Sequence, residues 1–303
     1  MTVQDSATRP VAIAVSGGTT LAALGVAAFS LTFPATAWAL EGLGPWSTVG
    51  ARTVLTSLIA VIALAVRRVP LPDRRHWGGL LVVAAGVVVG YPVLTTLALQ
   101  TSTSSHAAVV VGLLPVTTAA YSALRTGTRH SRTYWGAALT GAAVVIAFAL
   151  QQSGGALSTA DLYLFGALLI CAAGYAEGGR LAREMPGWQV IGWALVPCLP
   201  VGLACTAVAL PFEPAHLTGH VVAGVVWLAA GSHCFGLTVW YRGMAAIGVA
   251  KASQLQLAQP LLTLVASVLL LDEHLTPAAP IAAVGVLVCI VVTQRTTNRP
   301  ERA

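Results

Sequence analysis

WYRGMAAIGVAKASQLQLAQPLLTLVASVLLLDEHLTP, residues Trp240–Pro277, is the stretch that decides the fold, because part of it recurs earlier in the chain. Its portion Arg242–Pro260 reads RGMAAIGVAKASQLQLAQP, and the segment Leu97–Pro115 reads LALQTSTSSHAAVVVGLLP. A shift of 145 residues, the separation of Pro115 from Pro260, also pairs Ala98 with Gly243, His106 with Lys251 and Ala107 with Ala252. The sequence therefore predicts two copies of one structural unit.

The composition around this repeat is that of a membrane protein. Of the 303 residues, 56% are hydrophobic and 9% are charged, whereas soluble domains carry about 25% charged residues. Apolar runs of about 20 residues match the length of a helix that crosses a bilayer. Ten such runs predict an all-α membrane protein with ten transmembrane helices: Val15–Trp38, Trp46–Val66, Trp77–Leu99, Ser105–Leu124, Tyr134–Leu150, Leu162–Leu181, Trp188–Leu210, Val221–Tyr241, Ala250–Leu271 and Ala278–Thr293.

The charges give this array an orientation. If the N-terminus is cytoplasmic, every basic residue except Arg52 falls in an inner segment, as the positive-inside rule requires. The outer loops carry only acidic residues: Glu41, Asp161, Glu213, Asp272 and Glu273. We therefore expect a multi-pass protein of the cytoplasmic membrane with both termini inside. An Arg-rich chain with Lys251 as its one lysine is typical of a GC-rich bacterial genome.

The repeat unit holds five predicted spans, so the second copy must enter the membrane in the opposite orientation. We expect the first five-helix repeat over residues 1–153 and the second, inverted repeat over residues 158–303. Inverted repeats recur in secondary transporters, where the substrate site lies at the repeat interface near the midplane.

Three stretches resemble the drug/metabolite transporter superfamily, EamA type: GPWSTVGARTVL (Gly44–Leu55), TTLALQTSTSSHAAVVVGLLP (Thr95–Pro115) and Trp240–Pro277. The resemblance implies a secondary carrier that exports small metabolites, such as amino acids or drug-like molecules, by alternating access. It also implies a structural or gating role for Arg52, which matches the family's arginine in the second span.

Other classes of protein fit the sequence less well. No G-x-x-x-x-G-K-[ST] motif occurs, and we expect no cofactor. The five cysteines form no C-x-x-C pair, so neither a metal site nor a catalytic centre is predicted. The net charge of +6 belongs to the inner loops and does not indicate nucleic acid. The expected partners are a small-molecule substrate and the lipid bilayer, and the oligomeric state stays open. The alternatives are a membrane enzyme acting on a lipid or prenyl substrate, and a membrane receptor or scaffold.

Polar and aromatic residues at mid-span depth are the candidates for substrate binding, because polar groups in a membrane face the bundle interior or a cavity. Pro115 and Pro260 each free a backbone carbonyl and bend a helix, which shapes a cavity or serves packing. The predicted substrate-binding residues are Tyr91, Pro115, Tyr175, His233, Gln259 and Pro260.

Three charged residues are candidates for coupling or gating. Glu177 either forms an i,i+3 ion pair with Arg180 or binds a proton or an amine in the cavity. Arg52 either snorkels outward or pairs with a carboxylate of an outer loop. Lys251 reaches lipid phosphate or a gate at the inner face. His233, by the same reasoning, is a neutral residue bonded between helices or a group that titrates near neutral pH.

Overall fold

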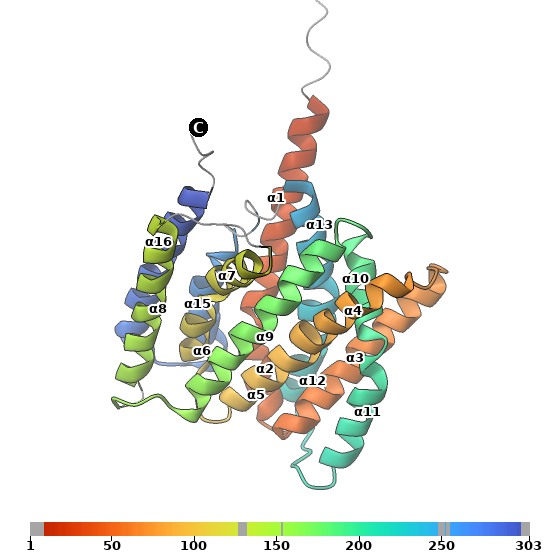
Figure 1. Cartoon of the computed structure of the whole chain (residues 1–303). Helices are drawn as coiled ribbons and strands as arrows, with labels where there is room; N and C mark the ends of the chain where they lie inside the picture. Colours follow the sequence, from red (N-terminus) through yellow and green to blue (C-terminus); the bar gives the residue numbers. More distant parts are fainter. Residues whose placement is uncertain (1–8, 127–131, 153, 248–251, 253–254, 298–303) are drawn as a thin grey trace, which may run out of the picture.

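The computed structural model describes residues 9–126, 132–152, 154–247, 252 and 255–297, and within them all regular structure is helical apart from one isolated bridge between Leu43 and Ala215. This confirms the all-α prediction. Figure 1 shows the helices as one bundle. They are α1 (Arg9–Ser30), α2 (Thr32–Leu40), α3 (Pro45–Val66), α4 (Arg74–Val83), η1 (Ala84–Gly90), α5 (Tyr91–Ala98), α6 (Ser104–Val111), α7 (Leu114–Thr126), α8 (Arg132–Gln152), α9 (Thr159–Leu181), α10 (Gly187–Leu195), α11 (Cys198–Ala209), α12 (Gly219–Val226), η2 (Trp227–Gly236), α13 (Leu237–Ile247), α15 (Gln259–Leu271) and α16 (Ala278–Thr297).

Among the described residues, seven helices are long and apolar enough to cross a membrane, and up to eight if the bent pair α10 and α11 is one span. That pair is bent by 44°. The regions of the two remaining predicted spans hold shorter apolar helices, Gln259–Leu271 and Ala278–Cys289. The chain is thus a multi-pass membrane protein, and the count of ten stays a prediction.

Local chemistry explains where several helices begin. Pro45 opens α3, where its missing N–H costs nothing because the first turn has no acceptor for it. Ser158 and Asp161 form a reciprocal capping box at the start of α9. The side chains of Thr103 and Thr218 cap α6 and α12 by a single hydrogen bond each, accepted from the N–H groups of His106 and Val221. At these four helices the local sequence therefore fixes where the helix begins.

The 145-residue repeat is also present in the secondary structure. The helix α7 begins at Leu114 and α15 begins 145 residues later at Gln259, each after a two-residue break. The two π-helical segments η1 and η2 overlap under the same shift. A π-helix holds an extra residue per turn, is rare, and is frequently found at functional sites. The structure thus repeats its two main irregularities, not only its helices.

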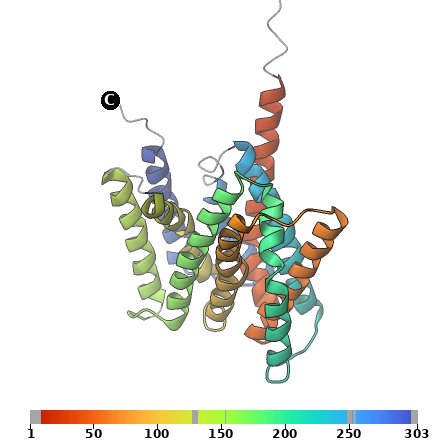
Figure 2. The ribbon, with the colours of Figure 1, turned by 45° about the vertical axis from the view of Figure 1, so that its right-hand side comes forward.

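The packing of the helices follows the same pairing. The first span packs along α12, η2 and α13, and its repeat equivalent α9 packs along α4, η1 and α5. The shift of 145 residues places α3 on the region of α11 and α8 on α16, and the two members of each of these pairs pack against each other. In Figures 1 and 2, α8 and α16 lie at the left edge of the bundle, and α3 and α11 lie at its right edge. The helix α1 begins and α16 ends on the same side of the bundle, as an even number of spans requires (Figure 1).

A glycine contact sets the distance between α9 and η1. A Cβ atom on Gly86 would lie 2.5 Å from the carbonyl oxygen of Ile170 and 3.1 Å from the Cα of Gly174. Small residues let helix backbones approach closely in membranes, where dispersion and polar contacts replace the hydrophobic effect. This close approach holds the third and sixth spans together beside the centre of the molecule.

Candidate functional site

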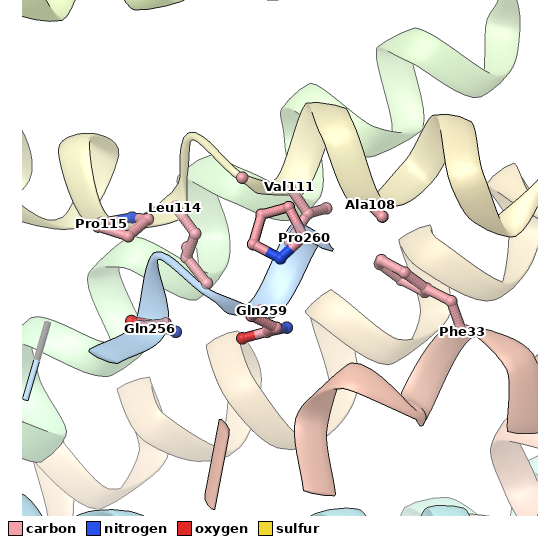
Figure 3. Close-up of a pocket in the computed structure, with 9 residues that line it drawn as sticks. Phe33, Ala108, Val111, Leu114, Pro115, Gln256, Gln259 and Pro260 are labelled. Atoms are coloured by element: carbon pink, nitrogen blue, oxygen red, sulfur yellow. The ribbon is translucent and has the colours of Figure 1, made fainter. Parts of the chain in front are cut away.

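A small pocket lies where the two broken spans meet (Figure 3). It is lined by residues of three segments, from α2, from α6 with α7, and from the start of α15: Phe33, Ala108, Val111, Gly112, Leu114, Pro115, Gln256, Gln259 and Pro260. Pro260 is buried, and Pro115 and Gln259 are partly buried. The structure therefore brings three of the predicted substrate-binding residues together.

The breaks before α7 and α15 give the pocket its polarity. Each break interrupts regular helical hydrogen bonding beside the pocket, and Pro115 and Pro260 lack the N–H that would bond a carbonyl one turn earlier. Such half-helix ends form the substrate sites of many transporters. Gln256 is 6% exposed and lies opposite Leu114 and Pro115 (Figure 3). No described residue is hydrogen-bonded to the side-chain amide of Gln256 or of Gln259, so both are available to a polar ligand.

A second polar group lies between α3 and η2. The Nη2 atom of Arg52 is 2.9 Å from Nδ1 of His233, and both side chains are buried. This corrects the sequence prediction for Arg52, which neither snorkels outward nor pairs with an outer carboxylate. The physical reason is that η2 places an imidazole acceptor within reach at the same depth. His233 is hydrogen-bonded to a residue of another helix, as one of the two interpretations of the sequence predicted.

This pair adjoins the pocket through the first span. The hydroxyl groups of Thr32 and Ser232 are 2.8 Å apart, and these residues precede Phe33 and His233 in the chain. The hydroxyl of Thr263, in α15, also donates to the carbonyl oxygen of Ser30 at 2.9 Å. The segment around the α1–α2 break thus joins the Arg52–His233 pair to the walls of the pocket.

Tyr91 and Tyr175 lie in a separate aromatic group. Tyr91 begins α5 directly after η1, and Tyr175 is partly buried in α9. Tyr175 lies near Tyr91, Tyr241 and Cys171. Neither Tyr91 nor Tyr175 lines the pocket of Figure 3. Tyr91 instead interacts with Arg52, so the predicted site residues divide into two adjoining groups.

Glu177 lies in a cluster of charges at the end of the bundle predicted to face the cytoplasm. Its carboxylate is 2.6 Å from Arg180 of the same helix and 3.2 Å from Arg125 of α7. Arg180 also binds Glu184 at 2.8 Å, and Glu184 is 2.9 Å from Nε2 of His76. The hydrogen bond with His76 lowers the pKa of the Glu184 carboxyl. The predicted ion pair of Glu177 with Arg180 is present, and this inner cluster ties α4, α7 and α9 together.

The opposite end is held by carboxylates that the sequence analysis had placed only as outer-loop charges. Glu213 accepts hydrogen bonds from the backbone N–H groups of Trp46 at 3.1 Å and Ser47 at 2.7 Å, at the start of α3. Glu273 accepts from the N–H groups of Ser104 at 2.9 Å and Ser105 at 3.0 Å, and from the Ser105 hydroxyl. We call these contacts the outer clasp. The sequence predicted helices that start at Trp46 and Ser105. It did not predict that carboxylates from distant loops, Glu213 and Glu273, bind these helix starts.

Two further findings complete the account of the predicted residues. Lys251 lies outside the described residues. Asp161 and His106, which the sequence analysis did not connect, are joined by a 2.6 Å contact between α9 and α6. Among the described residues, no group of three or more His, Cys, Asp or Glu side chains has the arrangement of a metal site.

An all-helical membrane bundle with repeated, broken spans and a polar pocket between them has the architecture of a membrane transporter. The comparisons with known proteins give the family. The model of the EamA-like transporter family matches residues 16–149 and 158–294, and the chain belongs to this family. It is similar to an uncharacterized transporter of Bacillus subtilis (strain 168), YdeK, with 36% identity over 272 residues, covering 90% of this chain and 95% of that protein. The chain also shares its fold with a solved crystal structure, at a TM-score of 0.64 and 20% sequence identity. The match covers 94% of this chain and 99% of the chain in that structure.

Proposed function

We propose that this transporter moves small metabolites across the cytoplasmic membrane by alternating access, in the direction of export. The observation that carries the proposal is the pocket between the repeat-equivalent breaks before α7 and α15. Its half-helix ends and free glutamine amides offer polar contacts at a depth where lipid offers none. The proposal includes five spans in each of two inverted repeats, residues 1–153 and 158–303, with both termini in the cytoplasm.

Polar contacts at both ends support the alternating step. The outer clasp fixes the starts of α3 and α6, and the inner cluster around Glu177 fixes α4, α7 and α9. Both sets lie at bundle ends and include partly exposed side chains, Arg125 and Arg180 among them, so water can reach the groups when a contact breaks. We infer that transport opens these two sets in turn, with the pocket reaching one side of the membrane at a time.

The ion pairs of Glu177 guide our proposal for the driving force of transport. A proton carrier must release its proton to each side in turn, whereas Glu177 is held by two arginines. We therefore assign Glu177 to the inner gate and propose facilitated transport, with no part for ATP or a cofactor. We prefer transport to the enzyme alternative because the family model that matches the chain is that of a transporter, and because the His and carboxylate side chains at the inner end are engaged in ion pairs with one another and with arginines.

The test is solute flux in proteoliposomes that contain the purified full chain. A panel of amino acids, organic acids, nucleobases and drug-like cations is measured with and without a pH gradient. We expect saturable flux of at least one class that continues without the gradient. Cysteine substituted at Gln259 in a background without the five native cysteines should react with small water-soluble thiol reagents, and the transported solute should protect it. Flux equal to that of protein-free liposomes for the whole panel would refute the proposal.

A further inference from the structure

Arg52 is a buried cation in the interior of a membrane protein. Its side chain is 2% exposed, and it lies seven residues into α3, about 10 Å from the outer end of that helix. A guanidinium stays protonated in proteins, unlike a buried lysine. The charge at this position therefore cannot be removed by deprotonation and must be balanced by its surroundings.

No carboxylate among the described residues balances it. Each described carboxylate is either engaged elsewhere or exposed: Glu41 with His220, Asp73 with Arg75, Asp161 with His106 and Ser158, Glu177 and Glu184 in the inner cluster, Glu213 and Glu273 in the outer clasp, and Asp272 exposed at the end of α15. The hydrogen-bonding partner of the Arg52 guanidinium is His233, through Nδ1. A buried charge without a counter-charge is strongly unfavourable, and an uncharged imidazole acceptor offsets only part of that cost.

His233 adds a donor to the same place. Because its Nδ1 atom accepts from Arg52, the ring proton lies on Nε2. The ring lies near the backbone carbonyls of Val87 and Leu228, but Nε2 is buried and has no hydrogen-bond partner of good geometry within the described part of the chain. A buried donor without a partner is unusual and calls for an acceptor. His233 thus keeps an N–H group without a well-placed acceptor next to a guanidinium that has no carboxylate partner among the described residues.

The Arg52–His233 pair lies beside a segment that lines the pocket. His233 belongs to η2, and α3 also packs against η1 and α5 of the third span. The neighbouring Ser232 is hydrogen-bonded to Thr32, next to Phe33 of the pocket wall. The two repeat-equivalent π-helical segments, of a kind frequent at functional sites, therefore both pack against the helix that carries Arg52.

We propose that Arg52, supported by His233, binds the carboxylate of the transported molecule, so that the substrates are small organic acids or other carboxylate-bearing metabolites. This inference rests on the proposed transport function and deepens it. The planar guanidinium matches a carboxylate with two parallel hydrogen bonds, and the incoming anion supplies the charge that the chain lacks at this point. A neutral solute of the same shape leaves the guanidinium unbalanced and binds more weakly.

The test compares acids with their own amides. Wild-type protein is measured with short aliphatic and aromatic carboxylic acids and the matching primary amides, by flux in proteoliposomes and by the shift of the thermal unfolding midpoint. We expect acids to be carried and to raise the midpoint, with at least tenfold higher apparent affinity than the amides. In Arg52→Gln the preference for acids should fall at least tenfold. Arg67→Gln is the matched control, because it removes the same charge from the inner end of the same helix, over Trp188, and should keep the preference.

Arg52→Lys covers the case in which Arg52→Gln does not fold. It keeps the charge but not the two-pronged geometry, so acids should bind several-fold more weakly while the preference over amides persists. Arg52→Gln with an unchanged preference, Arg52→Lys with unchanged acid affinity, or a wild type that treats acids and amides alike overturns the inference. If the wild type carries neutral or cationic solutes but no acid, the inference fails and the transport function stands. If it carries no solute of any class, both fail.

Discussion

At the scale of single residues, Glu177 shows how a partner from another helix decides between two possible roles of a charged side chain. In the sequence it stands three residues before Arg180, which left an ion pair and a proton site as alternatives. In the structure the helix α7 adds Arg125 to the same carboxylate. A carboxylate held by arginines of two different helices ties those helices together at the inner end of the bundle.

Glu177→Gln should therefore weaken the inner cluster rather than uncouple a proton. Its carboxylate is 6% exposed while both arginines remain partly hydrated, so the expected loss of stability is about 1–3 kcal/mol. We expect a lower thermal midpoint, with gradient-driven uptake and counterflow reduced in parallel. Glu184→Gln, at a more exposed carboxylate, is the control and should lose less. Loss of gradient-driven uptake with intact counterflow would instead identify Glu177 as a proton carrier.

At the scale of helices, the contact between η1 and α9 depends on two glycines. A Cβ on Gly86 would lie 2.5 Å from the Ile170 carbonyl oxygen, so the helices must separate to accept any side chain there. Gly86→Val is expected to lower the thermal midpoint markedly and reduce transport. Gly78→Ala is the matched control, because nothing lies within 4 Å of its added Cβ and alanine stabilises a helix by about 0.5–1 kcal/mol relative to glycine. Equal midpoints for the two variants would disprove the close approach.

The outer clasp gives a second prediction at this scale. Glu273 accepts hydrogen bonds from the first N–H groups of α6, where a negative charge also suits the helix dipole. In Glu273→Gln the clasp should open more often, and a cysteine at Gln259 should react faster with a membrane-impermeant thiol reagent added on the Glu273 side. Asp272→Asn serves as the control, because Asp272 is exposed with φ of 51° and asparagine tolerates this left-handed conformation. If the cysteine at Gln259 is labelled at the same rate with the wild-type residues, with Glu273→Gln and with Asp272→Asn, the outer clasp has no gating role.

At the scale of the whole molecule, the two repeats predict a definite topology. Reporters fused after Arg75, Arg132, Arg183 and Ala303 should report the cytoplasm, and those after Gly155 and Glu213 the outside. The positive-inside rule and the inverted repeat both require this alternation. A cytoplasmic signal from the fusion at Gly155 would remove a span from the first repeat and refute the ten-span arrangement.

The sequence by itself determined the helical membrane fold, the repeat and the family. These follow from local quantities: apolar runs as long as a bilayer is thick, basic residues at alternate loops, and prolines 145 residues apart. Even the breaks before Pro115 and Pro260 could be predicted, because a proline bends its own helix whatever surrounds it.

The tertiary structure alone decided which polar residues are partners. Arg52 and His233 are 181 residues apart, and Glu273 is 169 residues from Ser104, so no spacing rule connects them. It also separated Tyr91 and Tyr175 from the pocket that holds Pro115, Gln259 and Pro260. The depth of a residue in its span can be read from the chain, but its direction around the helix depends on packing. Here the π-helical segments rotate the residues that follow them by an amount that hydrophobicity does not encode.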